Sequence, residues 1–110
     1  MARSVNVTEA RVVSLPAILR PPAEADIREI RATYEAIRPG LGERFVARLQ
    51  EALERIELTP ELSGVIWRDV RAARLRRFRH VVYYVVFADR VEVLAVMHGA
   101  RDAAAWRSRV

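Results

Sequence analysis

The chain has 110 residues, a mass of 12.6 kDa and a formal net charge of +5. This length allows one domain and leaves no room for a second hydrophobic core. The absence of cysteine excludes disulfides and thiol chemistry, and neither of the two histidines has carboxylates at helical ligand spacing, so we expect no metal and no cofactor. No segment approaches the roughly 20 apolar residues of a membrane span, and the first residues lack the apolar run of a signal peptide. We therefore expect a soluble, cytoplasmic protein with no membrane partner.

The positive charge lies mainly in the second half of the chain. All 19 basic residues are arginines, whose planar guanidinium suits phosphate and carboxylate. Residues 68–79 contain six of them against a single acidic residue, Asp69, whereas residues 23–61 are acidic overall. Like charges this dense on neighbouring strands repel one another. The run predicts a surface for acidic partner residues, and a solvated strand face is the alternative interpretation.

The first half of the chain predicts a strand and two helices. Residues 12–19 favour a short edge strand interrupted by Pro16. The preceding residues 1–11 form an arm of uncertain order, and we expect a single domain over residues 12–110. A helix begins after two prolines, 21 and 22, and carries an apolar stripe that ends before Pro39 and Gly40. A second amphipathic helix over residues 42–59 follows a short turn, which favours an antiparallel hairpin.

The second half predicts a sheet. Residues 65–70, 74–79, 81–87 and 91–97 read as strands, and the third of these is apolar on both faces, as in a central strand. A final stretch over 102–109 forms one or two helical turns, with Asp102 as N-cap. The order predicts an α+β fold with an N-terminal strand and an antiparallel helical hairpin. The hairpin packs on one face of a mainly antiparallel sheet of three to four strands.

Local strings in this order resemble one family of bacterial toxins. Residues 21–30 (PPAEADIREI), 78–84 (FRHVVYY) and 93–102 (VLAVMHGARD), the last followed by Trp106, are similar to the helix start, central strand and C-terminal ending of ParE toxins, and Arg71 matches a further V-R pair. Arg79 and His80 depart from the usual Pro and Tyr. The chain is thus identified as a ParE-like member of the RelE/ParE superfamily over residues 12–107, with the RelE/ParE-like fold.

This resemblance implies the toxin of a type II toxin–antitoxin system. A ParE-like toxin inhibits DNA gyrase by binding it, without catalysis, and is neutralised by a cognate ParD-like antitoxin with an acidic C-terminal segment. Contact with nucleic acid is then indirect, through the antitoxin or the target. Two alternatives stay open, namely a RelE-like ribosome-dependent mRNA endonuclease and a non-toxic module that only binds antitoxin.

The endonuclease alternative depends on a small set of ionisable residues. Arg76 and Arg101 align roughly with two arginines that RelE-type enzymes direct at the phosphate, and His98 could transfer a proton. The tyrosine expected in the C-terminal turn is missing, because Trp106 and Arg107 stand there. Indole does not act as a general acid or base, so the sequence favours the non-enzymatic interpretation.

The candidate interaction residues form two sets. The expected antitoxin-binding residues are Arg71, Arg74, Arg76, Arg77 and Arg79. The expected target-binding residues lie in the C-terminal segment and are Arg101, Trp106 and Arg109. Trp106 also fits a hydrophobic cap on the sheet. Because segments beyond a last strand contribute little to a core, we expect Arg101→Ala and Arg109→Ala to leave the fold unchanged.

Overall fold

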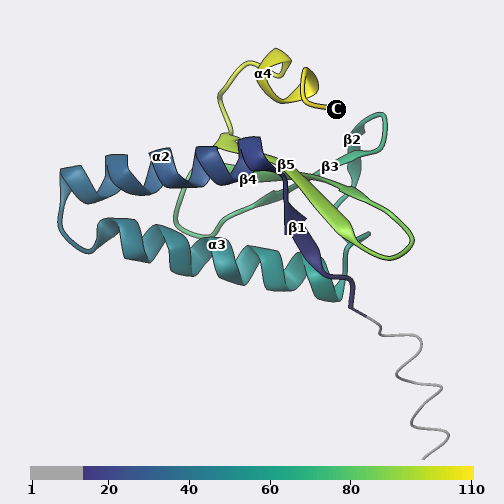
Figure 1. Cartoon of the computed structure of the whole chain (residues 1–110), viewed down its shortest axis with the longest axis horizontal. Coiled ribbons are helices and arrows are strands. Elements are labelled where there is room, and N and C mark those ends of the chain that lie inside the picture. The colour runs from purple at the N-terminus through teal and green to yellow at the C-terminus, as the bar shows by residue number, and fades with distance from the viewer. Residues whose placement is uncertain (1–13) are drawn as a thin grey trace, which may run out of the picture.

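The computed structural model describes residues 14–110, so the predicted arm over residues 1–11 and the first two residues of the strand predicted over 12–19 lie outside the described residues. In chain order the elements are β1 (Ala17–Leu19), α2 (Pro21–Ile37), α3 (Leu41–Leu58), β2 (Val65–Trp67), β3 (Val70–Arg74), β4 (His80–Val86), β5 (Val91–His98) and α4 (Ala104–Arg107). They form an α+β fold in which one sheet is covered by helices (Figure 1).

The sheet has five strands in the order β1-β5-β4-β3-β2. Strands β2 to β5 are antiparallel neighbours, whereas β1 joins β5 in parallel, with Ala17 opposite Val91. The predicted N-terminal strand therefore extends the same sheet, which is mixed and has more strands than the three to four expected. Because β1 and β5 are parallel, the chain crosses over between them through the rest of the fold.

The strand predicted over residues 74–79 is wrong. Strand β3 ends at Arg74, and residues 75–79 form a loop that the Leu75 amide closes by donating to the His80 carbonyl at 3.1 Å. Within this loop Arg77 has φ 67°, a left-handed conformation that no strand contains. The strand predicted over residues 65–70 is instead split, because Arg68 and Asp69 form the turn between β2 and β3.

The two helices form the predicted antiparallel hairpin, and its turn depends on two glycines. Gly40 has φ 88°, and a Cβ at Gly42 would lie 2.8 Å from the Arg31 carbonyl oxygen on α2. The Glu35 carboxylate accepts hydrogen bonds from the amides of Gly40 (3.0 Å) and Gly42 (3.1 Å), which satisfies the exposed N-terminus of α3. Within residues 14–110 no helix is long and apolar enough to cross a membrane.

Each face of the sheet has its own hydrophobic cluster, and Figure 1 shows α3 and α4 on opposite sides of the sheet. The larger cluster lies between the helical hairpin and the sheet, and confirms that both helices cover one face. Its buried residues are Ala23, Phe45, Leu49, Ala52, Ile56, Leu75, Val82, Tyr84, Val91, Val93 and Val96. The smaller cluster lies under the C-terminal segment and consists of Val70, Val81, Tyr83, Leu94, Ala95, Met97 and Trp106. Tyr83 and Tyr84 thus pack on opposite faces, as the alternation of side chains along a strand requires.

Candidate interaction surfaces

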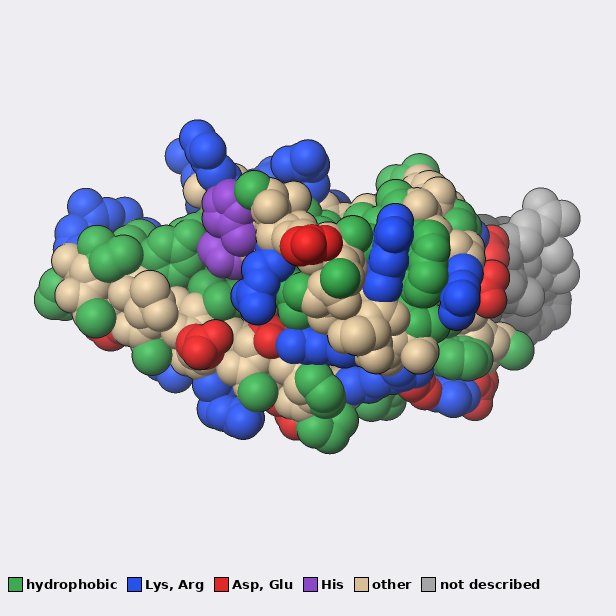
Figure 2. Space-filling model, turned by 90° about the horizontal axis from the view of Figure 1, so that it is seen from above, with side chains coloured by type: hydrophobic (Ala, Val, Ile, Leu, Met, Phe, Trp, Pro, Cys, Tyr) green, Lys and Arg blue, Asp and Glu red, His purple; other side chains and the backbone are tan. Residues whose placement is uncertain are grey.

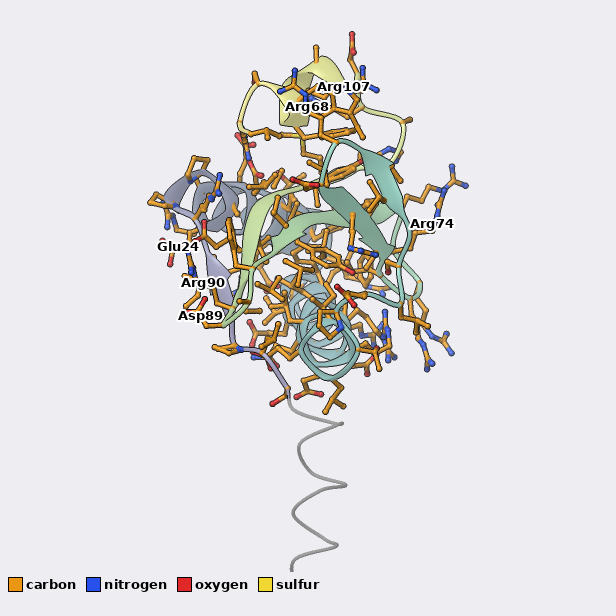
Figure 3. The ribbon with its side chains drawn as sticks, turned by 90° about the vertical axis from the view of Figure 1, so that its right-hand side faces the viewer. Glu24, Arg68, Arg74, Asp89, Arg90 and Arg107 are labelled. Carbon is orange, nitrogen blue, oxygen red and sulfur yellow. The ribbon has the colours of Figure 1, made fainter. Side chains whose placement is uncertain are left out.

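The five arginines expected to bind the antitoxin do not form one surface. The Arg71 side chain turns back on its own domain and donates to the carbonyls of Glu61 (3.2 Å) and Ser63 (2.6 Å). Arg74 lies on the other face of β3, because side chains alternate along a strand. Ala73 packs against the cluster under the helical hairpin, whereas Ala72, on the same face as Arg74, packs against the cluster under the C-terminal segment. Figure 3 shows Arg74 pointing away from the sheet. Three of the five arginines remain together on the loop.

Residues 75–79 present these three arginines to solvent around an inward phenylalanine. The side chains of Arg76, Arg77 and Arg79 are exposed. Phe78 packs between the helices, with its ring centroid 5.1 Å from that of Tyr34 and 5.6 Å from that of Phe45. The phenylalanine therefore anchors the loop to the hairpin and places Arg77 beside α3.

A groove separates this loop from the first half of α3. It has a volume of about 370 Å³ and is lined by Leu41, Arg44, Ala47, Arg48, Arg77 and Phe78. Arg48 donates to Glu51 at 2.8 Å, while Arg44 and Arg77 have no ion pair within residues 14–110. We call this feature the α3 groove. Its apolar floor and basic rim suit an amphipathic acidic segment, and Arg44 and Arg48 were not predicted because they occupy an ordinary polar face of their helix.

The alternative catalytic residues are only partly brought together. His98 and Arg101 line a pocket of about 120 Å³ between α2 and the end of β5, together with Asp26, Glu29 and His80. The histidine rings lie 5.7 Å apart, and Figure 2 shows histidine at the surface of this region. Arg76 does not line the pocket. No group of three His, Asp or Glu residues within 14–110 is placed to share a metal ion.

The chemistry of this pocket is limited by its inner histidine. His80 is buried at 8% exposure, and its Nδ1 atom has no hydrogen-bond partner among the described residues. Burial lowers the pKa of His80, and the nearby His98 lowers it further. The ring is therefore neutral near pH 7. The outer His98 accepts a hydrogen bond at Nδ1 from the amide of Ala100 (3.1 Å), which fixes the orientation of its ring.

Trp106 is a hydrophobic cap, as one of the two sequence interpretations expected. Its side chain is 4% exposed and stacks on Tyr83, with ring centroids 4.7 Å apart and planes at 14°. It also meets Trp67 edge-on at 5.9 Å. The carboxylate of Asp102 accepts a hydrogen bond from the amide of Ala104 (3.0 Å), although Ala103 is the N-cap residue of α4.

Arg109 has a structural role that corrects the expectation of a peripheral tail. Its guanidinium forms a forked ion pair with Asp26 of α2 at 2.6 and 3.1 Å, and it also donates to the Leu94 carbonyl at 3.1 Å. Leu94 has no partner in β4, because the register shifts there, and the Asp26 carboxylate accepts from the neighbouring Val96 amide at 3.0 Å. The pair therefore ties the C-terminal segment and α2 to an irregularity in β5. Arg101, in contrast, is exposed.

Comparison with known proteins assigns this fold to a family. A search of curated proteins finds no match. A solved structure titled "Chromosomal ParDE TA system from P. aeruginosa" superimposes with a TM-score of 0.69 and 16% sequence identity, covering 77% of this chain and 96% of that one. The family described as "ParE toxin of type II toxin-antitoxin system, parDE" matches residues 17–103, from β1 to the segment before α4. The chain therefore belongs to the ParE toxins of type II toxin–antitoxin systems.

Proposed function

We propose that this protein inhibits DNA gyrase by binding it in the cytoplasm, without catalysis, and that a cognate ParD-like antitoxin neutralises it. The observation that carries the proposal is the family match across nearly the whole described fold. The side chains agree with it, because the C-terminal turn contains Trp106 in a buried stack and no tyrosine. A protein that acts by occupancy needs an interface and no proton-transfer group.

We further propose that the acidic C-terminal segment of the antitoxin occupies the α3 groove. Arg44 and Arg77 offer forked donors to carboxylates from opposite sides of the groove, while Leu41, Ala47 and Phe78 accept apolar side chains. Arg76 and Arg79 add charge on the same loop. This proposal keeps Arg76, Arg77 and Arg79 from the predicted set and replaces Arg71 and Arg74 with two arginines of α3.

The toxin proposal is tested with purified DNA gyrase. The wild-type protein is expected to inhibit supercoiling at micromolar concentration, and a peptide with the antitoxin's C-terminal sequence is expected to restore it. Inhibition must be measured beside a thermal unfolding curve, so that a misfolded preparation is recognised. Folded protein that arrests growth but leaves supercoiling unchanged contradicts gyrase as the target.

The antitoxin site is tested by charge reversal with a matched control. Arg44→Glu combined with Arg77→Glu is expected to weaken binding of the antitoxin segment by at least a hundredfold, and wild-type binding is expected to weaken as salt rises. Arg74→Glu combined with Arg101→Glu reverses the same number of charges on exposed residues outside the groove and is expected to change affinity less than threefold. Equal losses from both variants would show that only net charge matters and that the groove is not the site.

The ribosome-dependent endonuclease remains the second candidate function, because His98 and Arg101 share a pocket with His80, Asp26 and Glu29. The Glu29 carboxylate has no ion pair within residues 14–110 and disfavours a phosphate in this pocket, and Arg76 is not part of it. We therefore expect no cleavage of translated mRNA after induction. Primer extension that shows position-specific cuts, lost in both His98→Ala and Arg101→Ala, would place the endonuclease first.

A further inference from the structure

Two arginines from distant parts of the chain lie over the ring of one tryptophan, on the sheet face that carries α4. The guanidinium carbon of Arg68 lies 4.3 Å from the ring centroid of Trp67, and that of Arg107 lies 5.0 Å from the same centroid. The two cations therefore lie no farther apart than the sum of these distances. Figure 3 shows both arginines between the β2–β3 turn and α4. We call Trp67, Arg68 and Arg107 the Trp67 cluster.

The cluster is held in place by the core beneath it. Trp67 is half-buried and meets Trp106 edge-on at 5.9 Å, and Trp106 in turn stacks on Tyr83 at 4.7 Å. Arg107 also lies over Trp106, at 5.4 Å from its ring centroid. Like-charged guanidiniums repel, but the negative faces of the indoles stabilise both. These contacts favour conformations in which both guanidiniums lie over Trp67, which lowers the entropic cost of binding a partner.

Arg68 is placed there at a conformational cost. Its φ is 51°, in the left-handed region that residues other than glycine and asparagine rarely adopt. It is the first of the two residues that connect Trp67 to Val70, and glycine is favoured at this position when its φ is positive. Glycine would adopt this φ with less strain, so the presence of arginine here is better explained by a role of its guanidinium than by the shape of the backbone.

Neither guanidinium has an internal anionic partner. Among residues 14–110, no ion pair or side-chain hydrogen bond involves Arg68 or Arg107, and both side chains are exposed. The guanidinium N–H groups of Arg68 and Arg107 are therefore exposed to solvent and free to donate to a partner. Figure 2, seen from the side of α4, shows arginine and hydrophobic side chains intermixed on this face. Such a mixture of Trp and Arg is typical of the energetic centre of a protein interface.

The surroundings favour separate carboxylates over a polyphosphate chain. Exposed Asp69 follows Arg68 in the turn, and exposed Asp102 precedes α4, so a continuous nucleic-acid backbone would lie against negative charge. The arginines also occupy the indole on which a base of a single strand would stack. Carboxylates on a folded polypeptide are spaced apart and avoid both obstacles.

We infer that the Trp67 cluster binds an acidic polypeptide segment of the toxin's target, on a surface separate from the α3 groove. This inference rests on the proposed toxin function and deepens it by naming the contact. It also replaces the sequence-predicted target residues Trp106 and Arg109, which are turned inward, with residues that face outward. Trp106 and Arg109 then support the cluster instead of contacting the target.

The test compares five full-length variants. These are Arg68→Gly, Arg68→Glu, Arg107→Ala, the double variant Arg68→Ala/Arg107→Ala, and Arg38→Ala as a matched control at the exposed tip of the helical hairpin. Each is measured for growth arrest in cells without antitoxin, for inhibition of supercoiling, for antitoxin binding and for thermal midpoint. The double variant is expected to need at least tenfold more protein for inhibition, with antitoxin affinity and midpoint unchanged. Arg68→Glu is expected to lose more activity than Arg68→Gly, because it repels an acidic partner.

The outcomes separate this inference from the toxin proposal. A double variant as toxic as the wild type in both assays overturns the inference and leaves the toxin proposal intact. Wild-type protein that arrests growth without inhibiting gyrase overturns gyrase as target. The inference about the Trp67 cluster is then decided by whether the double variant still arrests growth. Wild-type protein that arrests nothing overturns both. Finally, binding of a 30-base-pair duplex by the wild type, lost in the double variant, would assign the cluster to nucleic acid and overturn the polypeptide partner.

Discussion

The two faces of the sheet are covered in different ways. Helices of 17 and 18 residues cover one face and enclose the larger hydrophobic cluster. The other face is covered by a segment with only a four-residue helix, held by the stack of Trp106 on Tyr83 and by the pair of Arg109 with Asp26. The first face therefore carries most of the stability, while the second can change its surface residues at lower cost. In our proposals the antitoxin binds against the first face and the target against the second.

Removing one large side chain from each face tests this difference directly. Phe45 is fully buried between the helices and the sheet, so Phe45→Ala is expected to lower the free energy of unfolding by about 3–5 kcal/mol. Trp106→Ala is expected to lie at the low end of the same range, about 3 kcal/mol, because the short segment around it can collapse into the space. Urea unfolding of both variants gives the two values. A larger loss for Trp106→Ala would mean that the thin cover, not the hairpin, carries the fold.

The next largest loss of stability is expected from breaking the Arg109–Asp26 ion pair, which holds the C-terminal segment against the sheet. The side chains of Arg109 and Asp26 are 24% and 15% exposed, so neither is well hydrated. Arg109→Ala leaves the carboxylate half-buried with only the Val96 amide as partner, and we expect a loss of about 1–2 kcal/mol. Arg101→Ala, on an exposed residue of the same segment, is the control and is expected to change stability by less than about 0.5 kcal/mol. Equal midpoints for both variants would contradict the structural role of Arg109.

Acidification is expected to lower the free energy of unfolding through His80, whose ring packs against Tyr34 and Phe45 of the helical hairpin. Burial and His98 lower the pKa of His80 from its ordinary value of 6.5. As the pH falls, the His80 imidazole is therefore protonated in the unfolded chain before it is protonated in the folded chain. Stability is therefore complete above pH 6.5 and falls as the pH drops below it. Glu29 and Asp26 on α2, with Arg101 and His98, face the same pocket. His80→Phe keeps an aromatic ring beside Tyr34 and Phe45 and is expected to flatten the pH profile just below pH 6.5. An unchanged profile would assign the acid sensitivity to the carboxylates.

The elements that sequence patterns predicted well are those whose signals are local. The stripes of the two helices and the apolar run of β4 each lie within one segment, and their observed bounds agree with the predictions within about two residues. The strand predicted over 74–79 failed because its alternating arginines imitate an exposed strand. Nothing in that composition indicates the left-handed Arg77, since neither glycine nor asparagine marks the turn.

The candidate surfaces depended on contacts that no local pattern contains. Asp26 and Arg109 are separated by 83 residues, and each alone resembles an ordinary surface charge. Arg68 and Arg107 likewise meet only because β2 and α4 lie over the same tryptophan. The predicted arginine run was a real concentration of charge, but strand alternation directs Arg71 and Arg74 to opposite faces. A run of arginines in the sequence therefore suggests more contacts with one partner than the folded protein can make, because some of the side chains lie on the other face of the sheet.

The smallest effect on stability is expected at Arg77, where the binding role of the side chain can be separated from the strain of its backbone. Arg77 has φ 67° and lines the α3 groove, so Arg77→Gly removes backbone strain together with the side chain. Because a left-handed residue with a Cβ costs roughly 1 kcal/mol relative to glycine, and added flexibility of the unfolded chain offsets part of this, we expect a gain of about 0.5 kcal/mol. Antitoxin affinity should nevertheless fall about tenfold. Arg44→Ala removes a guanidinium from the other side of the same groove without changing strain, and it should lower affinity with no gain in stability. If Arg77→Gly were destabilising, the loop would need the arginine for folding, and its left-handed backbone would say nothing about a partner.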